Sequence, residues 1–69
     1  MTDEQVDLVH KITLRYMKQL ETDADPEEVE VVRWAIHADL FEDDRLEDVS
    51  AVDLTDESDY CISIGGWRL

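Results

Sequence analysis

Basic residues, cysteine, proline and glycine are all scarce in this sequence, and each scarcity excludes something. The 69 residues include 6 Lys and Arg against 19 Asp and Glu, which gives a formal net charge of −13. Because such an excess of negative charge repels nucleic acid and anionic membrane surfaces, we expect the protein to bind neither directly. The single cysteine, Cys61, excludes an intramolecular disulfide and a four-cysteine zinc site.

Long apolar runs are absent as well. No stretch approaches the ~18 apolar residues of a membrane span, and the sequence does not open with the basic and apolar regions of a secretory signal. We therefore expect a cytoplasmic protein. One proline, two glycines and a hydrophobic fraction of 43% are typical of a folded chain, and the length predicts a single small acidic domain over residues 1–69.

The first segment with a helical pattern runs from residue 3 to about residue 21. Its apolar residues recur at helical spacing, and Thr2 followed by Gln5 fits a capping box. Half of the basic residues lie on the opposite face of this predicted helix. They are Lys11, Arg15 and Lys18.

A second helix is predicted from residue 26 to about residue 42. Asp25 fits the N-cap, Pro26 suits the first helical position, and Glu28 completes a second capping box. Apolar residues cover more than half of its circumference, which is too much for an ordinary surface helix. We therefore expect a central helix, packed by the first helix on one side and by another layer on the other.

After a short helical turn within an acidic stretch, the periodicity changes. The runs 50–54 and 60–64 alternate between apolar and polar residues, and the polar spacer 55–59 separates them. This pattern predicts a β-hairpin over 49–64, followed by a tail at 65–69. The predicted fold class is therefore α+β, with two antiparallel helices followed by a hairpin packed on the second helix. The predicted core comprises Val9, Ile12, Tyr16, Val32, Ile36, Leu40, Val52, Leu54, Ile62 and Ile64.

The residues that could carry chemistry favour structural interpretations. Cys61 lies among apolar neighbours in an acidic chain, a setting that raises the pKa of a thiol. His10 and His37 are far apart, without the spacing of metal ligands, and are interpreted as surface histidines. The carboxylates fall on polar faces or in loops, not in a pocket. We therefore expect a protein that is not an enzyme and that uses no cofactor or metal.

The distribution of acidic residues is the most informative feature. Nine of the eighteen residues from 42 to 59 are acidic, and Arg45 is the only basic residue among them. Carboxylates at neighbouring positions of a helix or strand face are spaced comparably with successive phosphates of nucleic acid. We therefore predict a partner-binding surface for a protein with a Lys- and Arg-rich, nucleic-acid-binding face. Its residues are Glu42, Asp43, Asp44, Glu47, Asp48, Asp53, Asp56, Glu57 and Asp59.

In size and charge the chain resembles the small acidic inhibitors encoded by phages and mobile elements, the anti-CRISPR and DNA-mimic proteins. The residues that carry the resemblance are the acidic groups 42–44, 47–48 and 56–59. Such families share no common fold, so the resemblance implies only a mode of action. Members typically occupy the DNA-binding surface of a target such as a CRISPR effector.

A different interpretation of the same charge is adaptation to salt. The chain is also similar to haloarchaeal cytoplasmic proteins, which are rich in acidic residues and poor in lysine. It contains 11 Asp and 8 Glu but only 2 Lys. On this interpretation the protein is a small interaction module, and its charge keeps it soluble in concentrated salt.

Two aromatic residues of the second helix, Trp34 and Phe41, flank its polar strip. One interpretation makes them core residues that the tail covers with Trp67. The other makes them a hydrophobic anchor in a protein interface, including that of a homodimer.

Overall fold

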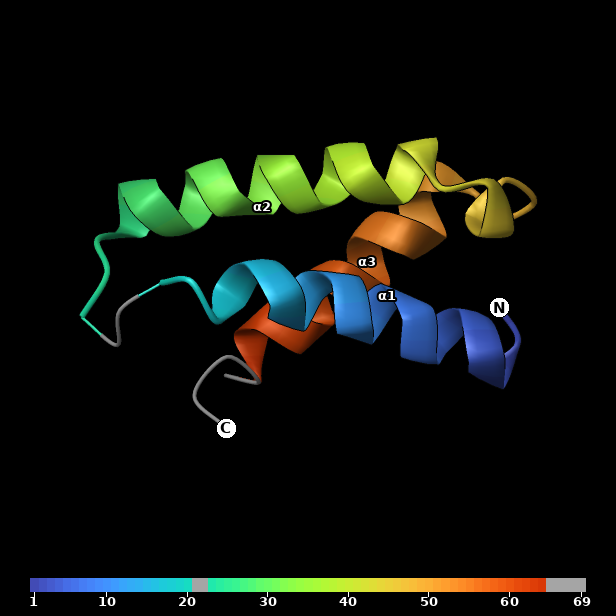
Figure 1. Cartoon of the computed structure of the whole chain (residues 1–69), viewed down its shortest axis with the longest axis horizontal. Coiled ribbons are helices and arrows are strands. Elements are labelled where there is room, and N and C mark those ends of the chain that lie inside the picture. Colours follow the sequence, from blue (N-terminus) through green and yellow to red (C-terminus); the bar gives the residue numbers. More distant parts are fainter. Residues whose placement is uncertain (21–22, 65–69) are drawn as a thin grey trace.

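The computed structural model describes residues 1–20 and 23–64, which form a bundle of helices (Figure 1). Helix α1 spans Asp3–Met17, α2 spans Pro26–Glu42 and α3 spans Ala51–Ser63, with the 3₁₀ helix η1 at Asp44–Leu46. Helix α2 runs back alongside α1, and α3 packs against both. No helix in these two ranges is long and apolar enough to cross a membrane.

Helix α1 begins where the sequence predicts and ends earlier. The Thr2 hydroxyl accepts a hydrogen bond from the Gln5 backbone N–H at 3.1 Å, and the Gln5 side chain accepts one from the Thr2 N–H at 3.0 Å. The predicted capping box is therefore confirmed. The helix ends at Met17 and not near residue 21, because Gln19 and Leu20 donate to the carbonyls three residues back and tighten the chain into a turn.

Helix α2 has the predicted bounds, but its N-terminus differs in one detail. Asp25 is the N-cap residue and Pro26 occupies the first turn, yet the Asp25 side chain makes no capping hydrogen bond. The predicted capping box with Glu28 is therefore wrong. The helix packs against both α1 and α3, while part of its circumference faces solvent.

The predicted hairpin over 49–64 is wrong, and with it the α+β class, because residues 51–63 form a helix and the described residues contain no strand. The Ser50 hydroxyl caps α3 by accepting a hydrogen bond from the Asp53 N–H at 3.2 Å. The buried positions of α3 recur at intervals of four, three and one residues, which is helical spacing. These positions are Leu54, Ser58, Cys61 and Ile62.

The core lies where the three helices meet, and the predicted core is partly wrong. Tyr16 and Val32 are only partly buried. Val52 is 66% exposed because the helix turns it outward, and Ile64, just past the end of α3, is 59% exposed. The predicted helical turn is present as η1, which buries Leu46 against the bundle. The buried core cluster consists of Val9, Ile12, Met17, Ile36, Leu40, Leu46, Leu54 and Ile62.

Candidate functional site

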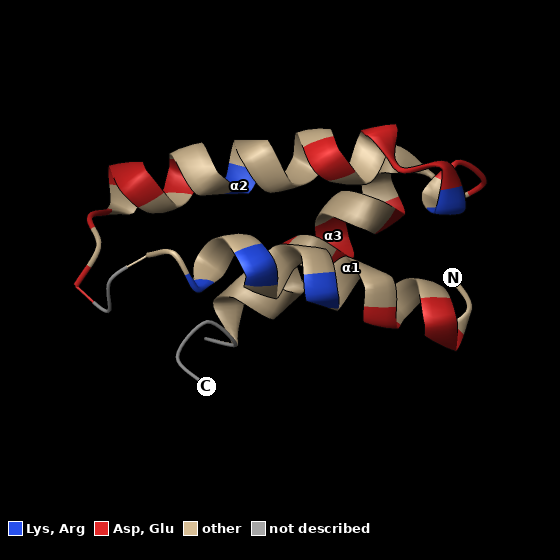
Figure 2. Ribbon diagram, viewed as in Figure 1, with Lys and Arg blue, Asp and Glu red and all other residues tan. Residues whose placement is uncertain are grey.

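Three helix termini meet at one end of the bundle and bring acidic residues together there (Figure 2). The Gln5 side-chain amide donates to an Asp48 carboxylate oxygen at 2.9 Å, which ties the first turn of α1 to the connection before α3. A shallow groove runs between these segments, with Thr2 and Asp53 in its lining. We call this region the acidic end. It comprises the carboxylates from residue 42 to residue 48 and those in the first two turns of α1 and α3, apart from Glu57, which pairs with His10. These are Asp3, Glu4, Asp7, Glu42, Asp43, Asp44, Glu47, Asp48, Asp53 and Asp56.

The helix dipoles divide the acidic end into favourable and unfavourable positions. The N-termini of α1 and α3 carry partial positive charge, so Asp3, Glu4 and Asp53 in their first turns are stabilised there. The C-terminus of α2 carries partial negative charge, yet Glu42 ends that helix and its last turn contains no basic residue. Negative charge is therefore concentrated at this point despite its electrostatic cost.

Asp43 belongs to the predicted binding residues, but its carboxylate is already occupied. Its oxygens accept hydrogen bonds from the Arg45 side chain at 3.0 and 2.8 Å and from the Arg45 backbone N–H at 2.9 Å. These bonds cap η1 and hold the pKa of the Asp43 carboxyl below its usual value. The same pairing engages Arg45, the one basic residue of the stretch, within the structure itself.

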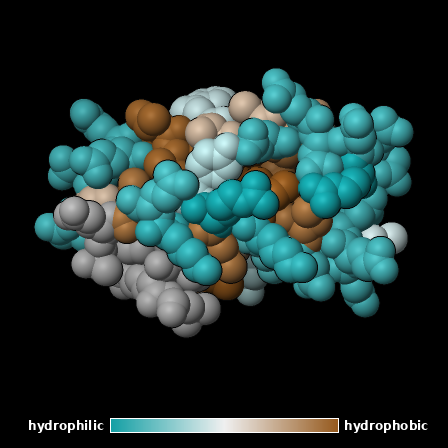
Figure 3. Space-filling view, in the orientation of Figure 1, coloured by the Kyte–Doolittle hydropathy of each residue, from teal (hydrophilic) through white to brown (hydrophobic). Residues whose placement is uncertain are grey.

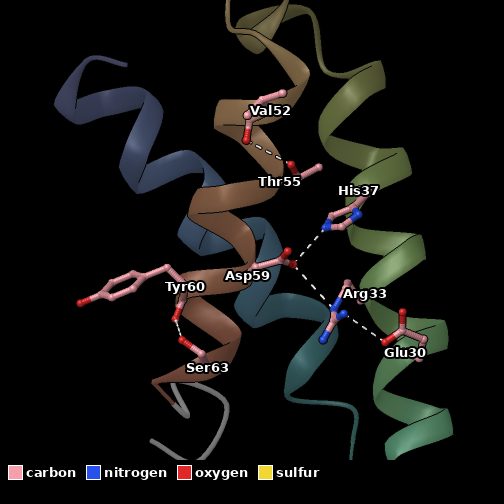
Figure 4. A network of polar contacts seen from close by, with 8 residues as sticks. All are labelled: Glu30, Arg33, His37, Val52, Thr55, Asp59, Tyr60 and Ser63. Carbon is pink, nitrogen blue, oxygen red and sulfur yellow. Dashed lines mark hydrogen bonds and ion pairs between the residues drawn. The ribbon is translucent and has the colours of Figure 1, made fainter.

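Glu57 and Asp59 are likewise drawn into contacts between helices. Glu57 lies 2.8 Å from His10 Nε2 and links α3 to α1. Asp59 lies 3.3 Å from His37 Nε2 and 3.6 Å from Arg33 Nε, and so links α3 to α2 (Figure 4). These two carboxylates are only partly exposed. The remaining predicted residues are exposed to solvent: Glu42, Asp44, Glu47, Asp48, Asp53 and Asp56.

Basic residues line a groove along α1 beside the acidic end. Lys11, Arg15 and Arg45 share this groove of about 580 Å³ with Glu4 and Asp7. The cations therefore lie along α1 and η1 directly beside carboxylates of the acidic end, and a second groove places Arg15 near Glu42. The separation of charge seen in the sequence is only partial in the fold.

The other candidate groups lie in structural positions. Burial raises the pKa of the Cys61 thiol, and the nearby Glu57 carboxylate raises it further, so the thiol stays protonated at neutral pH. His10 is partly buried, but His37 is only 7% exposed, and the prediction of a surface residue is wrong for it. Among residues 1–20 and 23–64, no three His, Cys, Asp or Glu side chains are placed to hold a metal ion.

The outer face of α2 carries exposed aromatic residues. Trp34 is 65% and Phe41 51% exposed, so neither is a core residue of the described chain. Trp67, which covers them in one of the two interpretations of the sequence, lies outside the described residues. Figure 3 shows hydrophilic residues covering the acidic end, and apolar residues reaching the surface elsewhere on the same face.

Sequence reasoning missed the polar contacts that join the helices. Besides the two histidine–carboxylate pairs, the Tyr16 hydroxyl of α1 donates to the Asp39 carboxylate of α2. Helical spacing over 54–62 would have placed Glu57 and Asp59 on a helix that faces the other two. The false hairpin placed them in or beside an exposed loop.

No protein-family model matches the chain, and no curated protein or solved structure shows detectable similarity to it.

Proposed function

We propose that this protein is a non-enzymatic inhibitor that binds the basic, nucleic-acid-binding surface of another protein inside the cell and competes there with nucleic acid. The observation that carries the proposal is the acidic end. Its ten carboxylates lie in the first two turns of α1 and α3 and between residues 42 and 48, and the one arginine of the stretch pairs there with Asp43. A CRISPR effector subunit is one target of the required kind.

The placement of the charge supports a role in binding. Glu42 and its neighbours stand at the negative end of α2, where carboxylates reduce helix stability. Facing a groove lined with Lys and Arg, the same carboxylates would accept charge-assisted hydrogen bonds and speed association. The predicted spacing along a hairpin face no longer applies. Residues three apart on a helix, such as Asp53 and Asp56, still lie about 5–6 Å apart at Cβ.

The experiment uses charge reversal at exposed positions of the acidic end. Asp44, Glu47 and Asp56 are exposed, and none forms an ion pair within the described part of the chain. We expect the triple variant D44K/E47K/D56K to stay folded and to lose binding. Asp43 is unsuitable for reversal, because its side chain caps η1.

A matched control exists at the opposite end of the bundle. Asp23, Glu27 and Glu28 are exposed, and D23K/E27K/E28K makes the same change in net charge. The immobilised protein is used as bait in a cell lysate, and the captured protein is challenged with duplex DNA or with mononucleotides at equal phosphate concentration. We expect only duplex DNA to displace it, and we expect the control triple to capture it normally. A captured protein that does not bind nucleic acid, or that DNA fails to displace, contradicts the proposal.

A second candidate function is a salt-adapted interaction module. The observation that favours it is the second acidic cluster at residues 23–28, because negative charge is not confined to the acidic end. Unfolding curves in low and in molar salt separate the two proposals. Loss of structure in low salt supports adaptation, and a folded protein in low salt supports the inhibitor.

A further inference from the structure

Helix α2 presents a row of apolar side chains to solvent. Val31, Trp34, Ala38 and Phe41 follow one another at helical spacing, and all are exposed, with Val31 at 68% and Trp34 at 65%. The row spans about 15 Å of the helix. Single exposed apolar residues are common on protein surfaces, but a contiguous row of this kind marks an interaction site. We call these four residues the outer stripe of α2.

Both aromatic side chains of the outer stripe contact the ring of a buried histidine, His37. The His37 ring is near both of them, with its centroid 5.9 Å from that of Trp34 and 6.2 Å from that of Phe41. His37 is itself buried and held by Asp59 of α3 (Figure 4). A braced aromatic loses less side-chain entropy when a partner covers it, which suits Trp34 to the role of an interface anchor.

The border of the outer stripe is negatively charged. Exposed Glu27, Glu30 and Glu42 flank it along the helix. Arg33 is the only Lys or Arg of α2, and it lies 3.1 Å from Glu30 and 3.6 Å from Asp59. The border thus keeps a net negative charge, which is complementary to lysine or arginine on a partner.

The same border disfavours a second copy of this chain. Antiparallel pairing of two α2 helices about the centre of the stripe places Glu30 of one copy opposite Glu42 of the other, twice. Parallel pairing places each carboxylate beside the same carboxylate of the other copy. Each chain also contributes a net charge of −13. Like charges at these positions oppose association.

We propose that the outer stripe of α2 docks a basic amphipathic helix of a partner protein. The partner helix would lay apolar residues, spaced three and four apart, on Trp34 and Phe41, while flanking Lys or Arg side chains reach Glu30 and Glu42. This site shares Glu42 with the acidic end but otherwise lies along the outer face of α2, and the proposal does not rest on the inhibitor function.

The experiment uses a designed helical peptide of about 15 residues, built from Leu and Lys in amphipathic order. In a W67F background Trp34 is the only tryptophan, so its fluorescence reports burial of the stripe. We expect the peptide to shift Trp34 emission to shorter wavelength. In the same background, loss of the Phe41 anchor in F41A should weaken binding roughly tenfold or more.

Three controls separate docking from simple charge attraction. A peptide with Ser in place of Leu keeps the charge but should leave Trp34 emission unchanged, and a Leu and Glu peptide should not bind. The variant Y60A removes an exposed aromatic residue from α3 and should bind as the parent does.

Two variants test the border and the stripe directly. Binding to these variants is measured by isothermal titration calorimetry, because W34S removes the fluorophore. The double variant E30Q/E42Q should weaken binding, and W34S should reduce it to the level of the Ser and Lys peptide. Peptide binding that is unaffected by W34S overturns the proposal. So does sedimentation of the free protein as a dimer that W34S converts to a monomer, because a second copy would then be the occupant. Peptide binding that becomes tighter when the segment 65–69 is deleted from the parent chain also overturns it, because that segment, with Trp67, would then be the occupant.

Discussion

Ser58 is a buried polar residue whose hydroxyl lacks a partner. Its side chain is fully enclosed between the helices, yet within the described residues its Oγ makes no hydrogen bond. Thr13, the other fully buried hydroxyl residue of the core, donates to the Val9 carbonyl at 2.8 Å. A buried hydroxyl without a hydrogen-bond partner destabilises the protein, because folding removes its hydrogen bonds to water and no protein group replaces them.

We therefore expect Ser58→Ala to stabilise the protein. Removing the unpaired hydroxyl should raise the free energy of unfolding by about 1 kcal/mol, and alanine also favours the helix. For a chain of this size the melting temperature should rise by about 4–8 °C. Ser63→Ala is the control, because Ser63 is exposed and its hydroxyl already donates to the Tyr60 carbonyl. A melting temperature that falls in Ser58→Ala would contradict the expectation.

Tyr16 and Asp39 form a contact whose strength depends on pH. The hydrogen bond to the Asp39 carboxylate raises the pKa of the Tyr16 phenol above 10.0, and burial adds to the shift. A raised pKa in the folded state means that the contact stabilises the protein fully below pH 10.0 and loses this effect as the pH rises through the folded pKa.

This shift is measured by alkaline titration of tyrosinate absorbance in a Y60F background, where Tyr16 is the only tyrosine. Asp39→Asn should lower the pKa of Tyr16, since it removes the charged acceptor. The difference in unfolding free energy between the parent and Tyr16→Phe should shrink above pH 10.0. An unchanged Tyr16 titration in Asp39→Asn would show that the carboxylate does not act on the phenol.

At the scale of elements, the starts of α1 and α2 were predictable because their signals are local. Thr2 with Gln5, and Asp25 with Pro26, mark these starts in the sequence alone. Helix α3 was missed because β-branched and aromatic residues gather at its ends and alternate over short runs. Its buried face includes a serine and a cysteine, so the helical period is less visible than in a purely apolar stripe.

The sequence identifies the acidic residues of the candidate site, but not which of them are free to bind a partner. Counting residues from 42 to 59 finds every carboxylate of the stretch. Which of them are already paired depends on the rotation of each residue about its helix. Asp56 is exposed, whereas Glu57, the next residue, lies against His10 of another helix. A predicted strand cannot make this distinction. The direction of side chains repeats every two residues in a strand but every 3.6 residues in a helix.

The N-cap of α3 gives a direct test of that element. Ser50→Ala removes the acceptor of the Asp53 N–H and should cost about 1 kcal/mol of stability. Asp25→Ala should cost less, because the Asp25 side chain makes no capping bond at the start of α2. Urea unfolding followed by circular dichroism measures both. Equal losses would mean that the Ser50 bond does not stabilise the helix.

At the scale of the whole molecule, self-repulsion sets how stability responds to salt. A chain of net charge −13 and 8.0 kDa gains stability when added salt screens its carboxylates. The two triple variants, D44K/E47K/D56K and D23K/E27K/E28K, reduce the net negative charge, and with it this self-repulsion, by the same amount. Each reversal changes the charge by two units, so three of them leave a net charge of −7.

The two triples should nevertheless differ in stability, and comparing that difference with their binding tests what the carboxylates of the acidic end do. Asp44 lies just past the negative end of α2, so D44K/E47K/D56K relieves repulsion and should raise the free energy of unfolding by roughly 0.3–1 kcal/mol. Glu27 and Glu28 lie at the positive end of α2, so D23K/E27K/E28K should lower it. Urea unfolding at several salt concentrations measures both effects. If the carboxylates serve target binding, the triple that stabilises the protein is the one that abolishes binding. If they serve salt adaptation, binding of any partner should respond equally to both triples, and the acidic end has no special role.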